Sequence, residues 1–163
     1  MYDFTKRDKV EDVDREAYVD LCSCMSAYHV LEGLKQADKE YASKHFEESN
    51  QFIMEAEKYN QYSPMVWLRK GLLLLAKGSF EAAEYQLSNV QQTEPNLIAA
   101  RLVSACVSFC AGSYKQALVG FQSCLKQIPN SGPVELRLAI GFCFEKLGFP
   151  EAARIAFERV LAM

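Results

Sequence analysis

Cysteine and histidine are the residue types in this chain best suited to metal or redox chemistry. The histidines are His29 and His45, and the cysteines are Cys22, Cys24, Cys106, Cys110, Cys124 and Cys143. No two cysteines have the two-residue spacing of a zinc knuckle, and both histidines lie in the first third of the chain. Cys106 and Cys110 would lie one turn apart on a helix, as a thiolate pair requires, but cysteine is also a common small buried residue. We therefore predict structural thiols in a reducing compartment, with no metal site and no cofactor.

The sequence contains no pattern typical of an active site. No nucleophile is paired with a base, and no two acids share an apolar setting. Gly71 and Lys77 bracket a run that includes four consecutive leucines, which differs from the glycine-rich turn between a strand and a helix that a P-loop requires. We predict that the chain is not an enzyme.

The distribution of charge argues against direct nucleic-acid binding. The 163 residues carry a formal net charge of −3, with 14 acids and 8 bases in residues 1–62 and 7 acids and 10 bases in residues 63–163. The bases are scattered, whereas phosphate recognition needs clusters of Lys and Arg. The first ten residues lack a signal-peptide core, and the aliphatic run 72–76 is too short to span a bilayer. We expect a soluble intracellular protein without membrane contact.

A set of landmark residues recurs at an interval of 34 residues. Gly78, Phe80, Ala83, Leu87 and Pro95 return as Gly112, Tyr114, Ala117, Phe121 and Pro129, and after a two-residue insertion Gly148, Ala153 and Phe157 follow. This period is typical of stacked helical repeats and resembles the tetratricopeptide repeat. Small residues mark the predicted helix crossings, namely Gly71, Ala105 and Gly141 on the first helices and Ala83, Ala117 and Ala153 on the second. Larger side chains there would overpack each crossing at a cost of about 1–3 kcal/mol.

The turns between the predicted helices have their own chemistry. Gly78 and Gly112 lie where a helix C-terminus favours a left-handed residue, and Ser79 and Ser113 follow as predicted caps of the next helix. Lys44 replaces the turn glycine in the region before Pro64, so the first copy is degenerate.

Two helices are predicted in this degenerate copy. The first covers about 14–34 and buries Tyr18, Leu21, Met25 and Tyr28. The second runs from about Ala37 or Glu40 to Asn60. Its residues Phe46, Ser49, Ile53 and Ala56 lie 34 positions before Phe80, Ala83, Leu87 and Val90.

These observations predict an all-α tetratricopeptide-repeat solenoid, an α-α superhelix of about four helix pairs. An extended lead-in of residues 1–13 precedes a single array over residues 14–163. Its copies are 14–62, 64–97, 98–131 and 134–163.

The first helix of each copy is expected to line a concave groove with apolar residues. These are Met65, Leu68, Leu72, Leu75, Leu102, Cys106, Phe109, Leu138 and Phe142. A leucine stripe of this spacing also occurs in ordinary cores, but a short array cannot bury every face of these helices. One apolar anchor contributes about 1.5–3 kcal/mol and association costs about 4–15 kcal/mol, so the partner must be a protein segment that places several anchors.

One alternative is a co-chaperone-like adaptor that binds a peptide C-terminus. Tetratricopeptide domains of that kind place Lys and Asn at groove positions where this chain has Leu68, Leu72, Leu102 and Cys106. The departure argues against a carboxylate clamp.

The last 70 residues carry a more specific resemblance. Residues 128–148 and 151–159, with Arg137-Leu138, Gly141, Cys143-Phe144 and Lys146-Leu147, resemble the tetratricopeptide scaffold subunit of the RNA polymerase II-associated factor (PAF) complex. The similarity extends over about residues 36–163.

This resemblance implies a nuclear, non-catalytic scaffold of transcription elongation that holds other PAF-complex subunits and supports histone modification. It implies that the segment in the groove belongs to another subunit and that contact with RNA polymerase II is indirect. It also implies that the chain is a fragment, since the long C-terminal helical region of the family does not follow residue 163.

Overall fold

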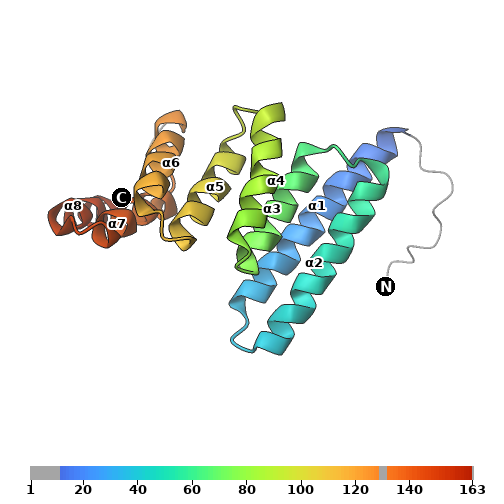
Figure 1. Ribbon diagram of the computed structural model, residues 1–163, viewed down its shortest axis with the longest axis horizontal. Helices are drawn as coiled ribbons and strands as arrows, with labels where there is room; N and C mark the ends of the chain where they lie inside the picture. The colour runs from blue at the N-terminus through green and yellow to red at the C-terminus, as the bar shows by residue number, and fades with distance from the viewer. Residues whose placement is uncertain (1–11, 129–131, 163) are drawn as a thin grey trace. The chain divides into compact units, whose positions relative to one another are not determined.

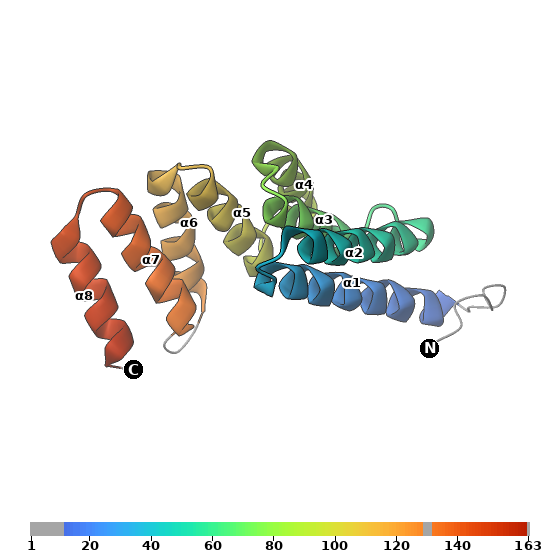
Figure 2. The same cartoon turned by 90° about the horizontal axis from the view of Figure 1, so that it is seen from below.

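The computed structural model describes residues 12–128 and 132–162, and within these ranges it is built from helices without a strand (Figures 1 and 2). The helices are α1 (Asp12–Lys35), α2 (Lys39–Tyr59), α3 (Pro64–Ala76), α4 (Phe80–Thr93), α5 (Ile98–Cys110), α6 (Tyr114–Gln127), α7 (Val134–Lys146) and α8 (Pro150–Leu161). The predicted all-α class is confirmed.

The chain separates into two compact units, Met1–Lys77 and Gly78–Met163. The first unit contains α1, α2 and α3, and the second contains α4 to α8. Of the predicted lead-in 1–13, residues 1–11 lie outside the described residues, and Asp12 and Val13 already belong to α1. Each unit has an apolar core of its own, and the single array over residues 14–163 stays a prediction.

The turn glycines adopt the predicted conformation. Gly78, Gly112 and Gly148 have φ angles of 76°, 82° and 79°, in the left-handed region that costs glycine little. Ser79 and Ser113 occupy the N-cap positions of α4 and α6, but their side chains make no capping hydrogen bond. The tight turn holds both serines outside the extended backbone region typical of a capping residue, so the predicted side-chain capping is wrong.

In the first unit, α1 and α2 lie side by side and α3 packs against both (Figures 1 and 2). The buried core residues are Val19, Cys22, Val30, Ile53, Ala56, Val66 and Leu73. Ser49, Ile53 and Ala56 are at most 2% exposed, which confirms the predicted register with Ala83, Leu87 and Val90.

The buried face of α1 agrees with the predicted one only in part, since Tyr18 packs against the core and Met25 is partly buried. Leu21 and Tyr28 are each 54% exposed, whereas Ser26 is fully buried and its hydroxyl lies 2.9 Å from that of Ser49. Apolar residues occur on several sides of α1, so their spacing alone could not identify the packed face. The small side chains at the crossing decide it.

The reversal between α1 and α2 lies where the predicted helix bounds place it, between Lys35 and Lys39. Lys44 is inside α2, and the turn comes earlier, where the Asp38 carboxylate accepts a hydrogen bond from the Glu40 amide at 2.8 Å. An aspartate cap therefore starts the helix in place of the glycine turn of the later copies.

The second unit contains the regular small-residue crossings. A Cβ atom added at Gly120 of α6 would lie 2.8 Å from the Cβ of Ala105 on α5, and one added at Gly141 of α7 would meet the ring of Phe157 on α8. All six residues predicted at the crossings are buried: Gly71 in the first unit, and Ala83, Ala105, Ala117, Gly141 and Ala153 in the second.

Candidate partner-binding surface

Four predicted groove residues lie on α3 in the first unit. Met65, Leu72 and Leu75 are partly buried, whereas Leu68 is only 2% exposed. Leu68 therefore stabilises the helix packing and presents almost no surface to a partner, while the other three leave part of each side chain accessible.

The remaining five lie on α5 and α7 in the second unit. Leu102 and Phe142 are 37% and 46% exposed, and Cys106, Phe109 and Leu138 are partly buried. Leu102, Cys106 and Phe109 are spaced by four and three residues, so they share one face of α5. The most accessible apolar groups of the predicted set are thus one leucine and one phenylalanine.

Aromatic contacts hold two of these side chains in place. The Phe109 ring meets the Tyr114 ring edge to face, with centroids 5.3 Å apart, and the Phe142 ring meets the Phe157 ring in the same way at 5.4 Å. Such pairs add about 0.5–1.5 kcal/mol beyond the buried area. The contact with Phe157 therefore restrains the Phe142 ring while 46% of the residue stays exposed, and such preorganisation lowers the entropic cost of binding.

The thiols of Cys106 and Cys143 near this surface are protonated and therefore unreactive at neutral pH. Burial, with smaller contributions from Cys110 and Cys124, raises the pKa of Cys106 to about 11, and burial raises the pKa of Cys143 to about 11 as well. Both therefore carry their protons at neutral pH, whereas metal binding and nucleophilic attack need the thiolate. This supports the interpretation of these cysteines as structural.

The structure has a cavity between α6, α7 and α8 that the sequence did not predict. It has a volume of about 330 Å³. Its lining consists of Gln122, Leu125, Arg137, Ile140, Phe144, Ala152, Ile155, Ala156 and Arg159. Among the described residues, the buried Nε of Arg137 has no hydrogen-bond partner. The sequence signal was the pair of arginines on α7 and α8, but nothing in the repeat period brings them to one cavity.

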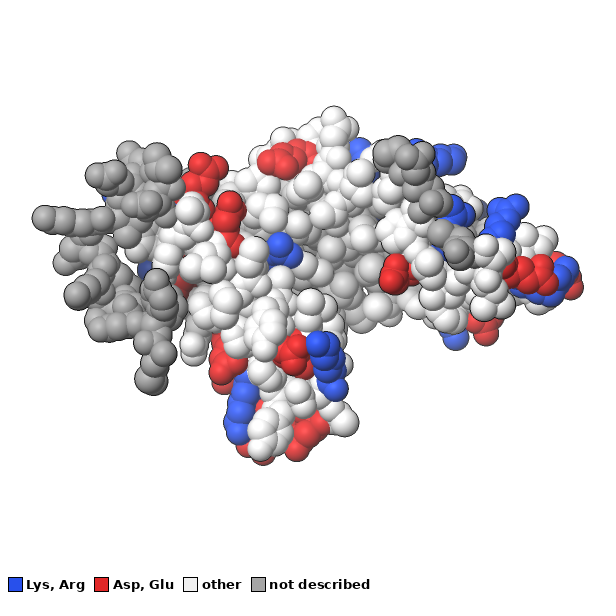
Figure 3. All heavy atoms as spheres, turned by 180° about the vertical axis from the view of Figure 1, so that it is seen from behind, with Lys and Arg blue, Asp and Glu red and all other residues white. Residues whose placement is uncertain are grey.

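The charged side chains show no concentration on the face drawn in Figure 3, where Lys and Arg are interspersed with Asp and Glu. None of the helices in the described ranges combines the length and the apolarity that crossing a membrane requires.

Comparison with solved structures identifies the class of fold. MamA AMB-1 superposes with a TM-score of 0.57 at 16% identity, covering 94% of this chain and 93% of that one. MamA MSR-1 gives a TM-score of 0.59 at 17% identity, covering 93% and 97%. At such identity the likeness shows the fold alone. Together with the paired helices and left-handed glycines, it confirms that this is a helical-repeat protein of the tetratricopeptide type.

Comparison with curated sequences narrows that class. No protein-family model matches the sequence. The chain is 31% identical over 143 residues to the protein CTR9 homolog of Arabidopsis thaliana, covering 88% of this chain and 13% of the relative. It is 25% identical over 165 residues to the RNA polymerase-associated protein CTR9 of Caenorhabditis elegans, covering 98% and 14%. The chain thus spans only a small part of these relatives. Both matches confirm the predicted resemblance to the tetratricopeptide scaffold subunit of the PAF complex.

Proposed function

We propose that this chain is a non-catalytic scaffold segment of a nuclear transcription elongation complex associated with RNA polymerase II, in which it holds part of another subunit. The observation that carries the proposal is the 31% identity to the CTR9 homolog of Arabidopsis thaliana across 88% of the chain. The tetratricopeptide fold supports it, because such folds commonly present surfaces to other polypeptides. The contact with the polymerase would be indirect, through the assembled complex.

The surface proposed for this contact is the predicted set on the first helices of the repeats. In the second unit it consists of the exposed Leu102 and Phe142 with the partly buried Cys106, Phe109 and Leu138. The first unit has its own part of the predicted set, the partly buried Met65, Leu72 and Leu75, and Leu68 is buried in the helix packing.

The occupant proposed for this surface is an extended or helical segment of another subunit. Each anchor supplies about 1.5–3 kcal/mol when fully buried, and less for side chains that are already half covered. Association costs about 4–15 kcal/mol, so at least three or four anchors must engage together. A segment that follows one helix face can deliver that number, whereas a small molecule on Leu102 or Phe142 alone cannot.

Co-purification of the chain with each other subunit of the complex tests this proposal. Leu102→Glu and Phe142→Glu each place a charge on an exposed apolar anchor, so we expect each to weaken binding of one subunit by at least about tenfold, or 1.4 kcal/mol. Val119→Glu is the matched control, because Val119 is an apolar residue of the same unit that is 62% exposed and lies outside the predicted set. Unchanged circular dichroism would show that the variants remain folded.

Two results would contradict the proposal. Equal binding by all three variants would exclude the surface while leaving the scaffold function intact. Failure of the unmodified chain to bind any subunit would exclude the scaffold function itself.

The adaptor alternative has one structural observation in its favour. Arg137 and Arg159 line one cavity together with several apolar side chains, a combination that suits a terminal carboxylate followed by an apolar side chain. Affinity for a free peptide that falls when its C-terminus is amidated, and that falls further on Arg159→Gln, would favour the adaptor. Affinity for an internal segment that is indifferent to amidation would favour the scaffold.

A further inference from the structure

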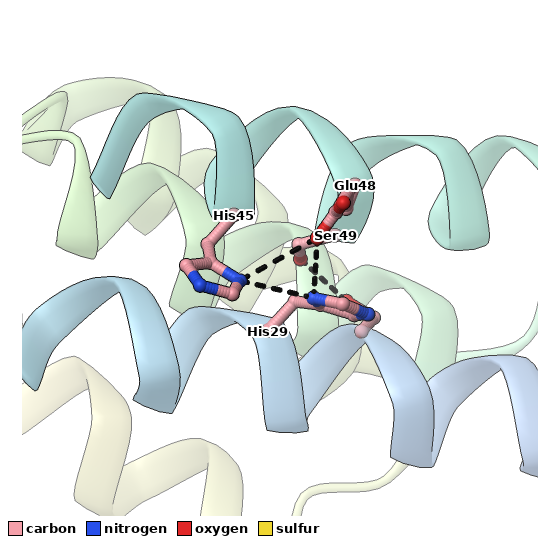
Figure 4. A network of polar contacts seen from close by, with 5 residues as sticks. His29, His45, Glu48 and Ser49 are labelled. Carbon is pink, nitrogen blue, oxygen red and sulfur yellow. Dashed lines mark hydrogen bonds and ion pairs between the residues drawn. The ribbon is translucent and has the colours of Figure 1, made fainter. Parts of the chain in front are cut away.

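A second cluster of chemistry-bearing side chains lies away from the partner surface, between α1 and α2 (Figure 4). His29 is on α1, and His45 and Glu48 are on α2, one turn apart on the same face. The His29 Nδ1 atom lies 3.3 Å from the His45 Nδ1 atom and 2.9 Å from the Glu48 Oε2 atom. The third side of the triangle, from His45 Nδ1 to Glu48 Oε2, measures 3.4 Å.

Hydrogen bonds cannot satisfy all three sides of this triangle when the carboxylate is ionised. If both Nδ1 atoms carry protons, each can donate to Glu48, but two donors then face each other across 3.3 Å. If only one Nδ1 atom carries a proton, the other nitrogen directs a lone pair at the carboxylate oxygen. Every assignment leaves two like groups in contact. A cation at the centre would accept electron density from all three atoms at once.

The size of the triangle fits a small cation such as zinc. Zinc is bound by imidazole nitrogen at about 2.0–2.1 Å and by carboxylate oxygen at about 2.0–2.2 Å in a tetrahedral arrangement, which places neighbouring ligand atoms about 3.4 Å apart. Two of the observed sides match this value, and the His29–Glu48 side must widen by only about 0.5 Å. Nitrogen-rich ligand sets also favour zinc over magnesium or calcium, which prefer oxygen.

The surrounding residues orient the ligands. The His29 ring stacks on Phe52 with centroids 5.5 Å apart and an angle of 17° between the planes, which restrains the plane of the imidazole. One turn away on each helix, the buried Ser26–Ser49 contact sets the distance between the helices. Gly33 allows Phe46 to approach, since a Cβ atom there would lie 2.6 Å from the ring. The α1–α2 pair therefore positions the ligands through packing that does not depend on the ion.

Exposure determines which coordination position stays open. The side chains of His29 and His45 are 14% and 28% exposed, and that of Glu48 is 50% exposed. The cluster is therefore closed on the helix side and open on the glutamate side, where water can supply a fourth ligand. Glu32 lies one turn beyond His29 and is engaged by Lys35, whose Nζ donates to it at 2.6 Å.

We propose that His29, His45 and Glu48 form a binding site for one zinc ion, with water as the fourth ligand. The ion would cross-link α1 and α2 in the copy that lacks a turn glycine. The histidines are 16 residues apart in sequence, and a search for closely spaced zinc ligands could not connect them.

Zinc titration of the metal-stripped 163-residue chain, labelled with ¹⁵N at histidine, tests the proposal. We expect one equivalent of zinc to bind, to shift the Nδ1 resonances of both histidines and to leave both Nε2 atoms protonated. The melting temperature should rise with zinc concentration, because a ligand of the folded state stabilises it by mass action. No uptake at micromolar zinc, or zinc bound through cysteine with the histidine resonances unchanged, would overturn the site.

Three variants separate coordination from general electrostatics. His45→Gln and Glu48→Gln each remove one ligand, and we expect each to weaken zinc binding by more than about tenfold. Glu47→Gln removes the same charge from the adjacent exposed position and should leave the affinity within about twofold of the unmodified chain. Equal affinity of Glu48→Gln and Glu47→Gln would contradict coordination by Glu48. If His45→Gln does not fold, the half-exposed Glu48 still provides the test.

Discussion

At the crossing of α1 and α2 two serine hydroxyls face each other, whereas at the crossing of α5 and α6 the methyl group of Ala105 lies where Gly120 has no side chain. Ser49 occupies the position that Ala83, Ala117 and Ala153 hold in the later copies. Both crossings thus use small side chains, but those between α1 and α2 are polar and those between α5 and α6 are apolar.

The difference extends to what surrounds each crossing. Next to Ser26 and Ser49 lie the two histidines and Glu48, while Ala105 belongs to a cluster with Phe121, Cys124 and Ile140. Close approach of helices requires small volume and not apolar character, provided that each buried polar group is paired. The degenerate copy therefore has a polar crossing where α5 and α6 have an apolar one.

The largest effect is expected from emptying the apolar cluster of the second unit. Phe121 is 3% exposed, and Phe121→Ala should lower the free energy of unfolding by about 3–5 kcal/mol, measured by urea denaturation. Val119→Ala, at a 62% exposed position of the same helix, should change it by less than about 0.5 kcal/mol. Similar values for the two variants would mean that this cluster is not the main source of stability there.

A smaller effect should follow from alkaline pH, again in the second unit. The pKa of Cys143 is raised by burial to about 11 from an ordinary value of 9.0. Between these values the unfolded chain loses the thiol proton while the folded chain retains it, so this contribution is complete below pH 9 and is lost as the pH approaches 11. We expect a loss of about 1–3 kcal/mol over that range. Cys143→Ala should show a shallower decline than the unmodified chain, and parallel declines would contradict the assignment.

The serine crossing should respond to single and double substitution in different ways. Ser49→Ala leaves the buried Ser26 hydroxyl without its partner and should cost about 1–2 kcal/mol, measured by thermal and urea unfolding. Ser26→Ala together with Ser49→Ala recreates an apolar crossing and should return the stability to within about 0.5 kcal/mol of the original. Additive losses in the double variant would show that the two hydroxyls do not depend on each other.

The 34-residue period predicted much of the fold for a physical reason. Gly78 and Gly112 are required by a left-handed backbone and Ala105 and Ala117 by a close crossing, so each repeats wherever the geometry repeats. The packed face of α1 could not be predicted in this way, because apolar residues occur on several sides of it and Leu21 proves to be exposed.

The candidate surface was predictable only in part. Helical spacing identified which residues share a face. The exposed fraction of each side chain, however, depends on neighbouring side chains that the spacing does not specify. Leu68 is buried and Leu102 is 37% exposed, although the same argument selected both. The approach of His29 to His45 depends on how α1 and α2 are aligned along each other, which the predicted helix bounds do not specify.

The smallest expected effects come from the two ways of making a turn. Asp38 caps α2 by accepting a hydrogen bond from the Glu40 amide, and Asp38→Ala should cost about 1 kcal/mol through the loss of that bond.

Gly112 has a φ of 82° and open space where a Cβ atom would lie, so Gly112→Ala should also cost about 1 kcal/mol, entirely through backbone strain. Gly112→Asn separates the two causes, because asparagine tolerates the left-handed region and should recover part of the loss, whereas Asp38→Asn should retain the cap. Thermal unfolding of the four variants measures this. If Gly112→Asn were no more stable than Gly112→Ala, backbone strain at the turn would not explain the loss. The proposed difference between a turn stabilised by a side-chain cap and one that requires a left-handed glycine would then be wrong.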